Sequence, residues 1–474
     1  MSSQGNAALD YFPSNAVQRT IAAFADGTIR KDDGSGASWV TLVSGLTTSG
    51  AVPMFVNCGE EAAGNNRKVA YCDGVNSVRI LAADGAAMTV LATPPADWSG
   101  TNQPRTLVLD RHGYLWGGGN ANGPHQMHRS LATNHENFTG TVFNMLLGPD
   151  LEEQYIAASI AYKTGVLVWK YPVGVYFIDT SDATPANWRA VKVGRAGASG
   201  PGNIVVAEDD VIWPAPDGSW HALSATAATG SVKASDFASR KLGAFSRDQI
   251  NLNQLSTAQL IYYSHKQELM LACHASGQSA KNRRLHLDIN ARPGSTTQPQ
   301  AAPVVGERWH WGDRDRNEAL FLRQKSGIQI PAMLDASGQL WELDRPNRNA
   351  DSAGYTFEWF IADSDFAQLV KGWQGRKKNG RFLQIEHAST GSATHTVEVF
   401  RDGDLKQTIT FALAGGSAAL PLALSATLGA DTMQVTARRK LKGQAHRWAL
   451  RGYSTVANED VSIAKLLIGL DLAA

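Results

Sequence analysis

Three histidines and a glutamate lie close together in one polar segment of the chain. His125, His128, His135 and Glu136 fall within twelve residues, and neutral imidazoles with a carboxylate are ligands that zinc prefers. Spacings of three and seven residues would suit one face of a helix, but the glycines and asparagines that precede them predict a loop. We therefore interpret the segment as a solvated loop and expect no metal site.

Carboxylate pairs are a second source of possible chemistry, because glycoside hydrolysis needs two of them at a fixed separation. His310 beside Asp313 and Asp315 is a candidate catalytic set. Adjacent residues of a strand point to opposite faces, so the flanking Trp309 and Trp311 favour a buried aromatic wall instead. Two other pairs have the character of turn residues: Asp209 with Asp210, and Asp363 with Asp365.

Known catalytic motifs are a third place to look. Propellers that cleave sialic acid repeat the turn Ser-x-Asp-x-Gly-x-x-Trp. Residues 36–39 keep the Gly-to-Trp spacing, but Asp32 and Gly34 stand where Ser and Asp belong, and the turn does not recur. The chain has no Gly-x-Ser-x-Gly elbow, no phosphate-binding Gly-rich loop ending in Lys, and no His-Glu-x-x-His. We expect no enzymatic activity, no catalytic residue and no cofactor.

Two short basic runs stand out in the last quarter of the chain, although the whole chain has a net charge of only +1. They supply the candidate contact residues Arg376, Lys377, Lys378, Arg381, Arg438, Arg439, Lys440 and Lys442. One interpretation is a solvated edge that blocks strand-to-strand aggregation. The other is contact with phosphate or with acidic groups of a neighbouring subunit, where charge pairs determine register more than affinity.

Short strands must position all of these residues. The 474 residues include 45 glycines and 13 tryptophans and are 43% hydrophobic, a composition that predicts a folded chain with more than one core. Apolar runs alternate with turn dipeptides in which Gly accepts a positive φ. The predicted turns are Asp26-Gly27, Asp33-Gly34, Asp73-Gly74, Asp84-Gly85, Asp217-Gly218, Ser337-Gly338 and Asp402-Gly403. Helical patterns are confined to residues 256–260 and 365–369.

A loose unit of hairpins and a Trp-bearing strand recurs about six times, which predicts an all-β fold with a β-propeller of about six blades over residues 16–344. Residues 328–343 form a further half-unit that either completes the ring or begins a seventh blade. Inner strands such as 106–109 and 203–206 should be nearly inaccessible. We expect an N-terminal arm over 1–15, a linker over 345–354 and a C-terminal β-sandwich over 355–474.

Two segments need separate interpretation. Residues 411–430 carry no charge, but their glycines and proline favour two strands joined by a loop over a membrane span. Residues 290–305 are long enough to form a projecting loop.

Three cysteines without regular spacing, Cys58, Cys72 and Cys273, predict free buried thiols in a reducing compartment, and residues 1–6 lack the pattern of a secretory signal.

In the architecture of nearly all its 474 residues, the chain resembles the tail nozzle (tail hub, tail tubular) proteins of short-tailed bacteriophages. The resemblance rests on a propeller pattern followed by five segments, namely residues 360–365, 380–386, 396–403, 442–450 and 463–472. It implies a virion structural protein that forms a homohexameric tube below the portal and its adaptor ring. Such a tube extends the channel for double-stranded DNA and takes part in genome retention and ejection.

The resemblance also implies partners and a location. We expect contacts with portal adaptor proteins and with tail fibre or plug proteins, non-specific passage of DNA, and a place in the virion tail after assembly in the host cytoplasm. The segment 290–305 is the candidate gate loop. A carbohydrate-binding or glycoside-hydrolysing propeller with an accessory sandwich remains the alternative.

Overall fold

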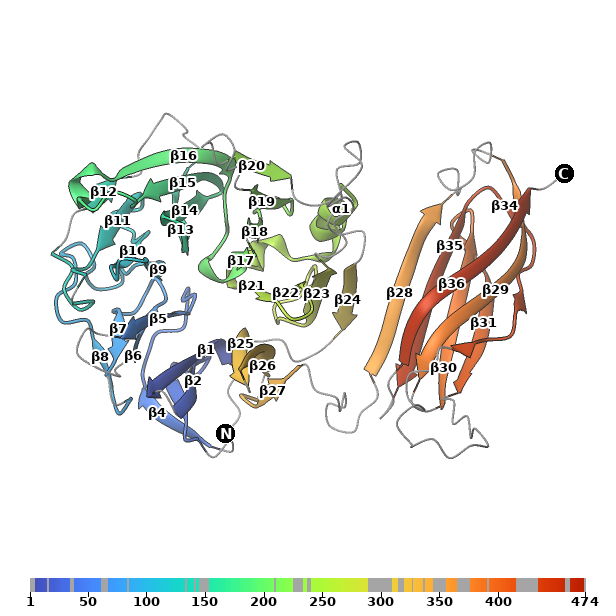
Figure 1. Cartoon of the computed structure of the whole chain (residues 1–474), viewed down its shortest axis with the longest axis horizontal. Coiled ribbons are helices and arrows are strands. Elements are labelled where there is room, and N and C mark those ends of the chain that lie inside the picture. The colour runs from blue at the N-terminus through green and yellow to red at the C-terminus, as the bar shows by residue number, and fades with distance from the viewer. Residues whose placement is uncertain are drawn as a thin grey trace. The chain divides into compact units, whose positions relative to one another are not determined.

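A computed structural model gives the fold of two units, each of which we describe by itself (Figure 1). The first unit comprises Met1–Trp309 and Asp313–Leu343, and the second comprises His310–Gly312 and Asp344–Ala474. The structure describes residues 5–14, 17–34, 38–60, 67–82, 85–132, 134–139, 142–144, 153–208, 210–224, 233–236, 240–288, 309–313, 319–325, 327–335, 337–343, 355–364, 376–389, 392–414, 434–456 and 461–472.

The described residues form many small antiparallel sheets and almost no helix, so the all-β class is confirmed. The first three sheets hold β1 (Gly5–Ser14), β2 (Val17–Phe24), β3 (Ile29–Asp32) and β4 (Trp39–Val43); β5 (Met54–Glu60), β6 (Arg67–Cys72), β7 (Arg79–Leu81) and β8 (Met88–Val90); and β9 (Thr106–Leu109), β10 (Leu115–Gly118), β11 (Gln126–Arg129) and β12 (Val142–Asn144).

The next four sheets continue in chain order. They hold β13 (Tyr155–Tyr162), β14 (Gly165–Tyr171), β15 (Val173–Asp179) and β16 (Arg189–Ala196); β17 (Val205–Ala207), β18 (Asp210–Pro214), β19 (Trp220–Ser224) and β20 (Lys233–Asp236); β21 (Gln259–Tyr263), β22 (Glu268–Cys273), β23 (Arg283–Asp288) and β24 (Trp309–Asp313); and β25 (Ala319–Lys325), β26 (Ile328–Leu334) and β27 (Leu340–Glu342). The half-unit at 328–343 therefore forms a separate three-stranded sheet together with β25.

Helices are few and short in the described residues. They are η1 (Pro185–Asn187), η2 (Pro201–Asn203), η3 (Leu252–Thr257) and α1 (Arg240–Gln249). The helical turn expected at 256–260 lies earlier in the chain, as η3. It ends at Thr257, because Gln259 already belongs to β21. The residue pattern of 240–249 did not predict α1. Residues 365–369 lie outside the described part.

The predicted turn glycines adopt the conformation that the hairpins require. All seven have a positive φ, between 67° and 91°, and each turn joins two consecutive antiparallel strands. At the tightest of them, Asp402 (φ 52°) and Gly403 (φ 91°) are the only residues between two paired strands. Positive φ at both central positions matches the right-handed twist of the flanking strands.

Hydrophobic clusters in the first unit form between neighbouring sheets. In β9, Leu107 packs with residues of the second sheet, whereas the adjacent Val108 packs with residues of the fourth. In β2, Ala23 packs toward the second sheet and Ala22 toward β25 and β26. Because both faces of these strands are buried, the sequence there is a continuous apolar run rather than an alternating one.

The first strands of successive sheets lie toward the middle of the first unit, with later strands outside them (Figure 1). β1 contacts β5, β5 contacts β9, β9 contacts β13, β17 contacts β21, β21 contacts β25, and β25 contacts β1. Of the inner positions expected to be inaccessible, 106–108 and 203–204 are buried. Leu109, Val205 and Val206, however, are only half-buried.

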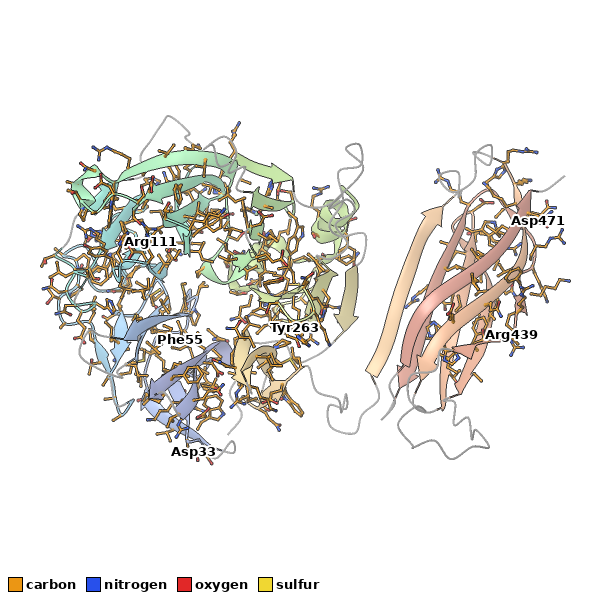
Figure 2. All side chains as sticks on the ribbon, viewed as in Figure 1. Asp33, Phe55, Arg111, Tyr263, Arg439 and Asp471 are labelled. Atoms are coloured by element: carbon orange, nitrogen blue, oxygen red, sulfur yellow. The ribbon has the colours of Figure 1, made fainter. Side chains whose placement is uncertain are left out.

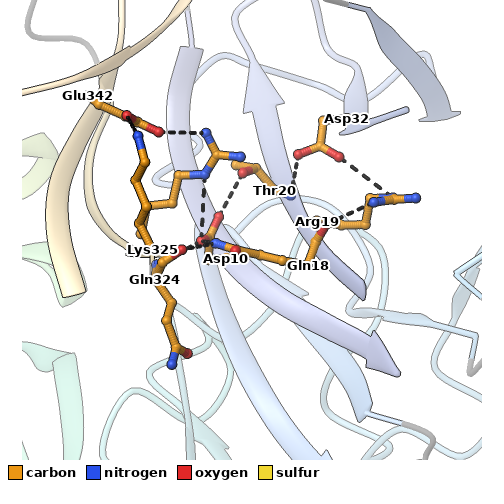
Figure 3. A network of polar contacts seen from close by, with 9 residues as sticks. Asp10, Gln18, Arg19, Thr20, Asp32, Gln324, Lys325 and Glu342 are labelled. Atoms are coloured by element: carbon orange, nitrogen blue, oxygen red, sulfur yellow. Dashed lines mark hydrogen bonds and ion pairs between the residues drawn. The ribbon is translucent and has the colours of Figure 1, made fainter. Parts of the chain in front are cut away.

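A polar network joins the first and last sheets of this unit (Figure 3). The buried carboxylate of Asp10 accepts hydrogen bonds from Thr20 Oγ1 (2.7 Å) and from the backbone amide of Gln324 (3.1 Å). Arg323 lies 3.9 Å from Asp10 and also pairs with Glu342 at 3.3 Å. The contacts fasten β1 and β2 to β25 and β27.

In the second unit, two antiparallel sheets contribute to one core. One holds β28 (Tyr355–Ser364), β35 (Trp448–Val456), β30 (Ser392–Arg401) and β31 (Asp404–Ala414) in that order. In the other, β29 (Lys378–Ser389) pairs with β36 (Val461–Leu472) on one edge and with β32 (Gln434–Val435), β33 (Arg439–Lys440) and β34 (Gln444–Ala445) on the other. Leu383 and Ile385 of β29 pack with Val397, Phe411 and Trp448 of the first sheet.

Several expected boundaries change or lie outside the described residues. The arm expected over 1–15 is wrong for 5–14, which form β1 and pair with β2. Alternating apolar residues there, such as Ala7 and Tyr11, are buried. The linker 345–354, the loop 290–305 and most of 411–430 are not described; 411–414 end β31. Within the described residues, no helix is long and apolar enough to cross a membrane.

Candidate functional site

The two basic runs come together at one edge of β29. The first run begins this strand, and the second occupies β33 and the connection to β34. Phe382 is paired with Lys440, and Leu383 with Arg439. The amide of Leu441 also donates to the carbonyl of Arg381 at 3.2 Å. Segments that lie more than fifty residues apart in the sequence are thus neighbours in one sheet.

Seven of the eight candidate side chains are exposed, and we call them the basic patch. They are Arg376, Lys377, Arg381, Arg438, Arg439, Lys440 and Lys442. Among the described residues, only Arg381 has an ion-pair partner, Asp471 of β36, and both side chains are at least half exposed. Figure 2 labels Arg439 and Asp471. Because this one pair is solvated, most of the positive charge remains available.

Lys378 does not belong to the patch, so its prediction as a contact residue is wrong. Its side chain is fully buried, and Nζ donates to the carbonyl of His446 at 3.1 Å. The reason is a register shift between Gly380 and Phe382, where β29 has one extra residue opposite β36. The extra residue reverses the inward and outward alternation, which turns Lys378 inward and leaves Arg381 outside.

The patch is held by defined contacts rather than by loose loops. Gln407 of β31 donates through Nε2 to the carbonyl of Lys440 (2.9 Å) and accepts from the amide of Lys442 (3.0 Å). The guanidinium of Arg438 lies 4.4 Å from the centre of the Phe382 ring. These contacts tie the second basic run to both sheets of the unit.

This arrangement suits anion binding. Guanidinium groups recognise carboxylate and phosphate through paired hydrogen bonds, while lysines act as point charges. Like charges along one sheet edge repel one another, and an acidic partner would relieve that repulsion. A solvated edge that prevents strand pairing remains compatible with the same geometry.

Two of the three histidines of the polar segment have separate hydrogen-bond partners. His128 hydrogen-bonds to Asp97 at 3.1 Å, and His135 to the carbonyl of Gly113 at 2.8 Å. Burial lowers the pKa of His128, although Asp97 opposes this shift. In the part of the chain that is described, no three His, Cys, Asp or Glu side chains gather as metal ligands.

Most of the remaining candidate side chains lie outside the described part of the chain. Asp209, Asp315 and Asp365 lie outside the described residues, and so do the side chains of Asp313 and Asp363. Cys58, Cys72 and Cys273 are buried free thiols. Burial raises the pKa of both Cys72 and Cys273, which makes their reactive thiolate forms unfavourable.

An aspartate turn that was not predicted occurs twice in the first unit. Asp110 accepts from the amides of His112 and Tyr114 and from Trp116 Nε1 (2.9 Å). Asp335 accepts in the same way from the amides two and four residues later and from Trp341 Nε1 (2.8 Å). Both turns read Asp-x-x-Gly-x-Leu-Trp in the sequence, a signal that was available there.

Comparisons with known proteins leave the chain unassigned. No family model and no curated protein matches it. Solved structures align at low similarity. The Mitotic Checkpoint Complex aligns at 13% identity and a TM-score of 0.40, covering 72% of this chain and 90% of that one. BBS1N in complex with ARL6DN aligns at 11% identity and a TM-score of 0.43, covering 73% and 94%.

The extracellular domain of a putative hybrid two-component system from B. thetaiotaomicron aligns at 12% identity and a TM-score of 0.44. That alignment covers 86% of this chain and 46% of that one. Likenesses at this level assign the chain neither a fold family nor a function.

Proposed function

We propose that this chain is a non-enzymatic structural subunit of a ring, the tail nozzle of a short-tailed bacteriophage. In the ring, the basic patch contacts acidic groups of a neighbouring subunit or adaptor. The observation that carries the proposal is the convergence of two distant basic runs on one exposed sheet edge, where Asp471 is the only described acidic side chain in an ion pair with the patch.

The proposal includes a finer architecture for each unit. The seven successive sheets, with β25 against β1, support a closed seven-bladed propeller whose last blade has three described strands. The shared core of the two sheets in the second unit supports a β-sandwich. Rigid modules of this kind suit a subunit of a tube, because closure leaves few free strand edges.

In this proposal six copies form the tube. Portal adaptor proteins and fibre or plug proteins are its neighbours, and double-stranded DNA passes through without sequence-specific contact. Assembly takes place in the host cytoplasm, and the protein resides in the virion tail. Phosphate attraction should be weak and strongly screened by salt, since a conduit that gripped DNA would slow its passage.

Mass photometry and negative-stain microscopy of the purified chain test the ring. We expect particles of about six copies with an axial opening. A variant with Arg376, Lys377, Arg438 and Arg439 changed to Ser should lose ring formation. A control with Arg111, Lys163, Arg189 and Lys406 changed to Ser removes the same charge from exposed positions elsewhere and should assemble normally.

Three outcomes would contradict the proposal. The first is a strictly monomeric wild-type chain in the presence of its adaptor, and the second is unimpaired assembly of the patch variant. The third is turnover of sialosides, common glycosides or phosphoesters that is lost on changing Asp313 or Asp315 to Asn, which would instead support the carbohydrate-active alternative.

A further inference from the structure

A polar cavity opens in the first unit where several first strands begin. It consists of two adjoining volumes of about 310 and 190 Å³, within the size range of small-molecule sites when taken together. Both volumes are lined by Ala51, Val52, Gln254, Ser256 and Thr257. Most of the lining comes from segments at or just before β1, β5, β9, β13, β17 and β21, while Asp73 directly follows β6 and His274 directly follows β22.

The larger volume offers one available positive charge. Arg105 lines it, with its guanidinium 4.4 Å from the centre of the Tyr155 ring, and has no ion pair among the described residues. Asp73 lines the same volume, and its carboxylate oxygens already have hydrogen-bond donors within the protein. It accepts from the amides of Val75 and Asn76, from Tyr71 Oη and from Asn76 Nδ2, at 2.6–2.9 Å.

Two buried polar side chains in the lining have a polar atom without a partner among the described residues. Ser199, 7% exposed, lines the larger volume, and its Oγ makes no hydrogen bond. His274, 6% exposed, lines the smaller one with Nδ1 unpartnered. Leaving such atoms unsatisfied costs free energy that a ligand would recover.

His274 provides an acceptor rather than a charge. Burial lowers its pKa to about 4, nearby Lys281 adds to the effect, and a hydrogen bond with the Ser279 backbone opposes it. The ring is therefore neutral at physiological pH. Since Nδ1 is unpartnered, the hydrogen bond to Ser279 comes from Nε2, which leaves Nδ1 as an acceptor for a hydroxyl group.

The wall of the cavity is tightly built. Gly200 lies so close to η3 that a Cβ there would approach the carbonyl oxygen of Ser256 to 2.1 Å. Asn203 Nδ2 donates to the carbonyl of Leu255 at 3.3 Å. Both contacts hold the segment that carries Ser199 against the segment that carries Ser256, so the cavity is preformed.

We propose that this cavity binds a small polyhydroxylated oxyanion, with its acidic group on Arg105 and its hydroxyls toward Ser199 and His274. A carboxylate and a phosphate both match the guanidinium fork. A sugar acid and a sugar phosphate thus share the required chemistry. The site is independent of the ring proposed above, because none of its residues belongs to the basic patch.

Isothermal titration calorimetry of the full chain with four probes tests this site. Gluconate and glucose 6-phosphate carry both features, glucose lacks the anion, and inorganic phosphate lacks the hydroxylated body. We expect at least one of the first two to bind with a Kd below about 1 mM and the last two to bind at least tenfold more weakly. The better anionic probe identifies the acidic group.

Variants separate this site from general charge attraction. Arg105→Met should weaken binding at least tenfold, Arg105→Lys less, and Ser199→Ala about threefold. Arg111→Met removes an exposed arginine outside the cavity and should leave binding unchanged; it also controls for folding. Equal affinity of wild type and Arg105→Met would overturn the proposal, as would absence of binding of both anionic probes at millimolar concentration.

Discussion

Gln324 donates its backbone amide to the carboxylate of Asp10 at 3.1 Å, although 314 residues separate them in the chain. Asp10 lies in β1 and Gln324 in β25, so the bond joins the first sheet to the last. A contact over such a distance in sequence has a large loop-closure cost. It becomes favourable only when the sheets between them are in place, and so it reports on the integrity of the whole unit.

Asp10→Ala should destabilise the first unit. It removes acceptors for Thr20, Gln18 and the Gln324 amide in a buried place, and we expect a loss of about 2–4 kcal/mol in the free energy of unfolding. Asp10→Asn keeps one acceptor oxygen and should lose less. Urea unfolding followed by tryptophan fluorescence measures both, with Asp404→Ala, an exposed carboxylate, as the control. Equal midpoints for all variants would show that the network contributes nothing.

Lys378 and Arg439 should differ sharply although both belong to the basic runs. Lys378→Ala leaves the His446 carbonyl without its donor and opens space in the core, so we expect a loss of about 1–3 kcal/mol. Arg439→Ala removes an exposed side chain and should change stability by less than about 0.5 kcal/mol. Thermal unfolding of the two variants measures this difference in stability. No loss of stability in Lys378→Ala would contradict the buried position of the Lys378 side chain.

The basic patch shows how far the sequence could predict this site. The runs, the turns beside them and the exposure of seven of the eight side chains were readable from residue types. Their proximity was not, because it depends on the pairing of Leu383 with Arg439, which lie more than fifty residues apart in the sequence. Lys378 was misplaced because strict alternation from Leu383 and Ile385 points it outward, and a bulge at Arg381 leaves no clear mark in the residue pattern.

Sheet number was open for a similar reason. Strands such as β9 are buried on both faces, so they carry no alternation that marks which neighbour they face. The cavity could not be predicted at all. Arg105, Ser199 and His274 belong to three different segments, and only the arrangement of the sheets brings those segments to one place.

The repeated aspartate turns allow a matched comparison. Asp110→Asn and Asp335→Asn each lose the acceptor for a tryptophan Nε1, but Trp116 is fully buried and Trp341 only half-buried. We expect about 2 kcal/mol for the first and about 1 kcal/mol for the second. Adding Trp116→Phe to Asp110→Asn removes the unsatisfied donor and should recover part of the loss. A reversed order of the two losses would refute the assigned role.

The pH dependence of Asp335 has a definite sign. Burial alone would raise its pKa, but hydrogen bonds from Ser337, Trp341 and Gln339 outweigh it and hold the pKa below the ordinary value of 3.8. The ionised carboxylate therefore contributes stability that is present above pH 3.8 and is lost as the pH falls through the lower folded-state value. In unfolding curves measured at a series of pH values, Asp335→Asn should reduce the loss of unfolding free energy at acid pH.

His395 should make the second unit acid-sensitive at a milder pH. Its side chain is fully buried in β30, and burial lowers its pKa from 6.5 to about 4. Between these two values the unfolded chain binds one more proton than the folded chain, so the free energy of unfolding falls as the pH decreases, by up to about 3 kcal/mol. His395→Phe should remove this part of the slope, whatever it does to stability at neutral pH.

Phe411→Leu, a change at the residue paired with His395, should lower stability equally at every pH and keep the slope. Urea unfolding of the three proteins between about pH 7 and pH 4.5 separates the two effects, and an unchanged slope in His395→Phe would show that this histidine is already charged in the folded chain.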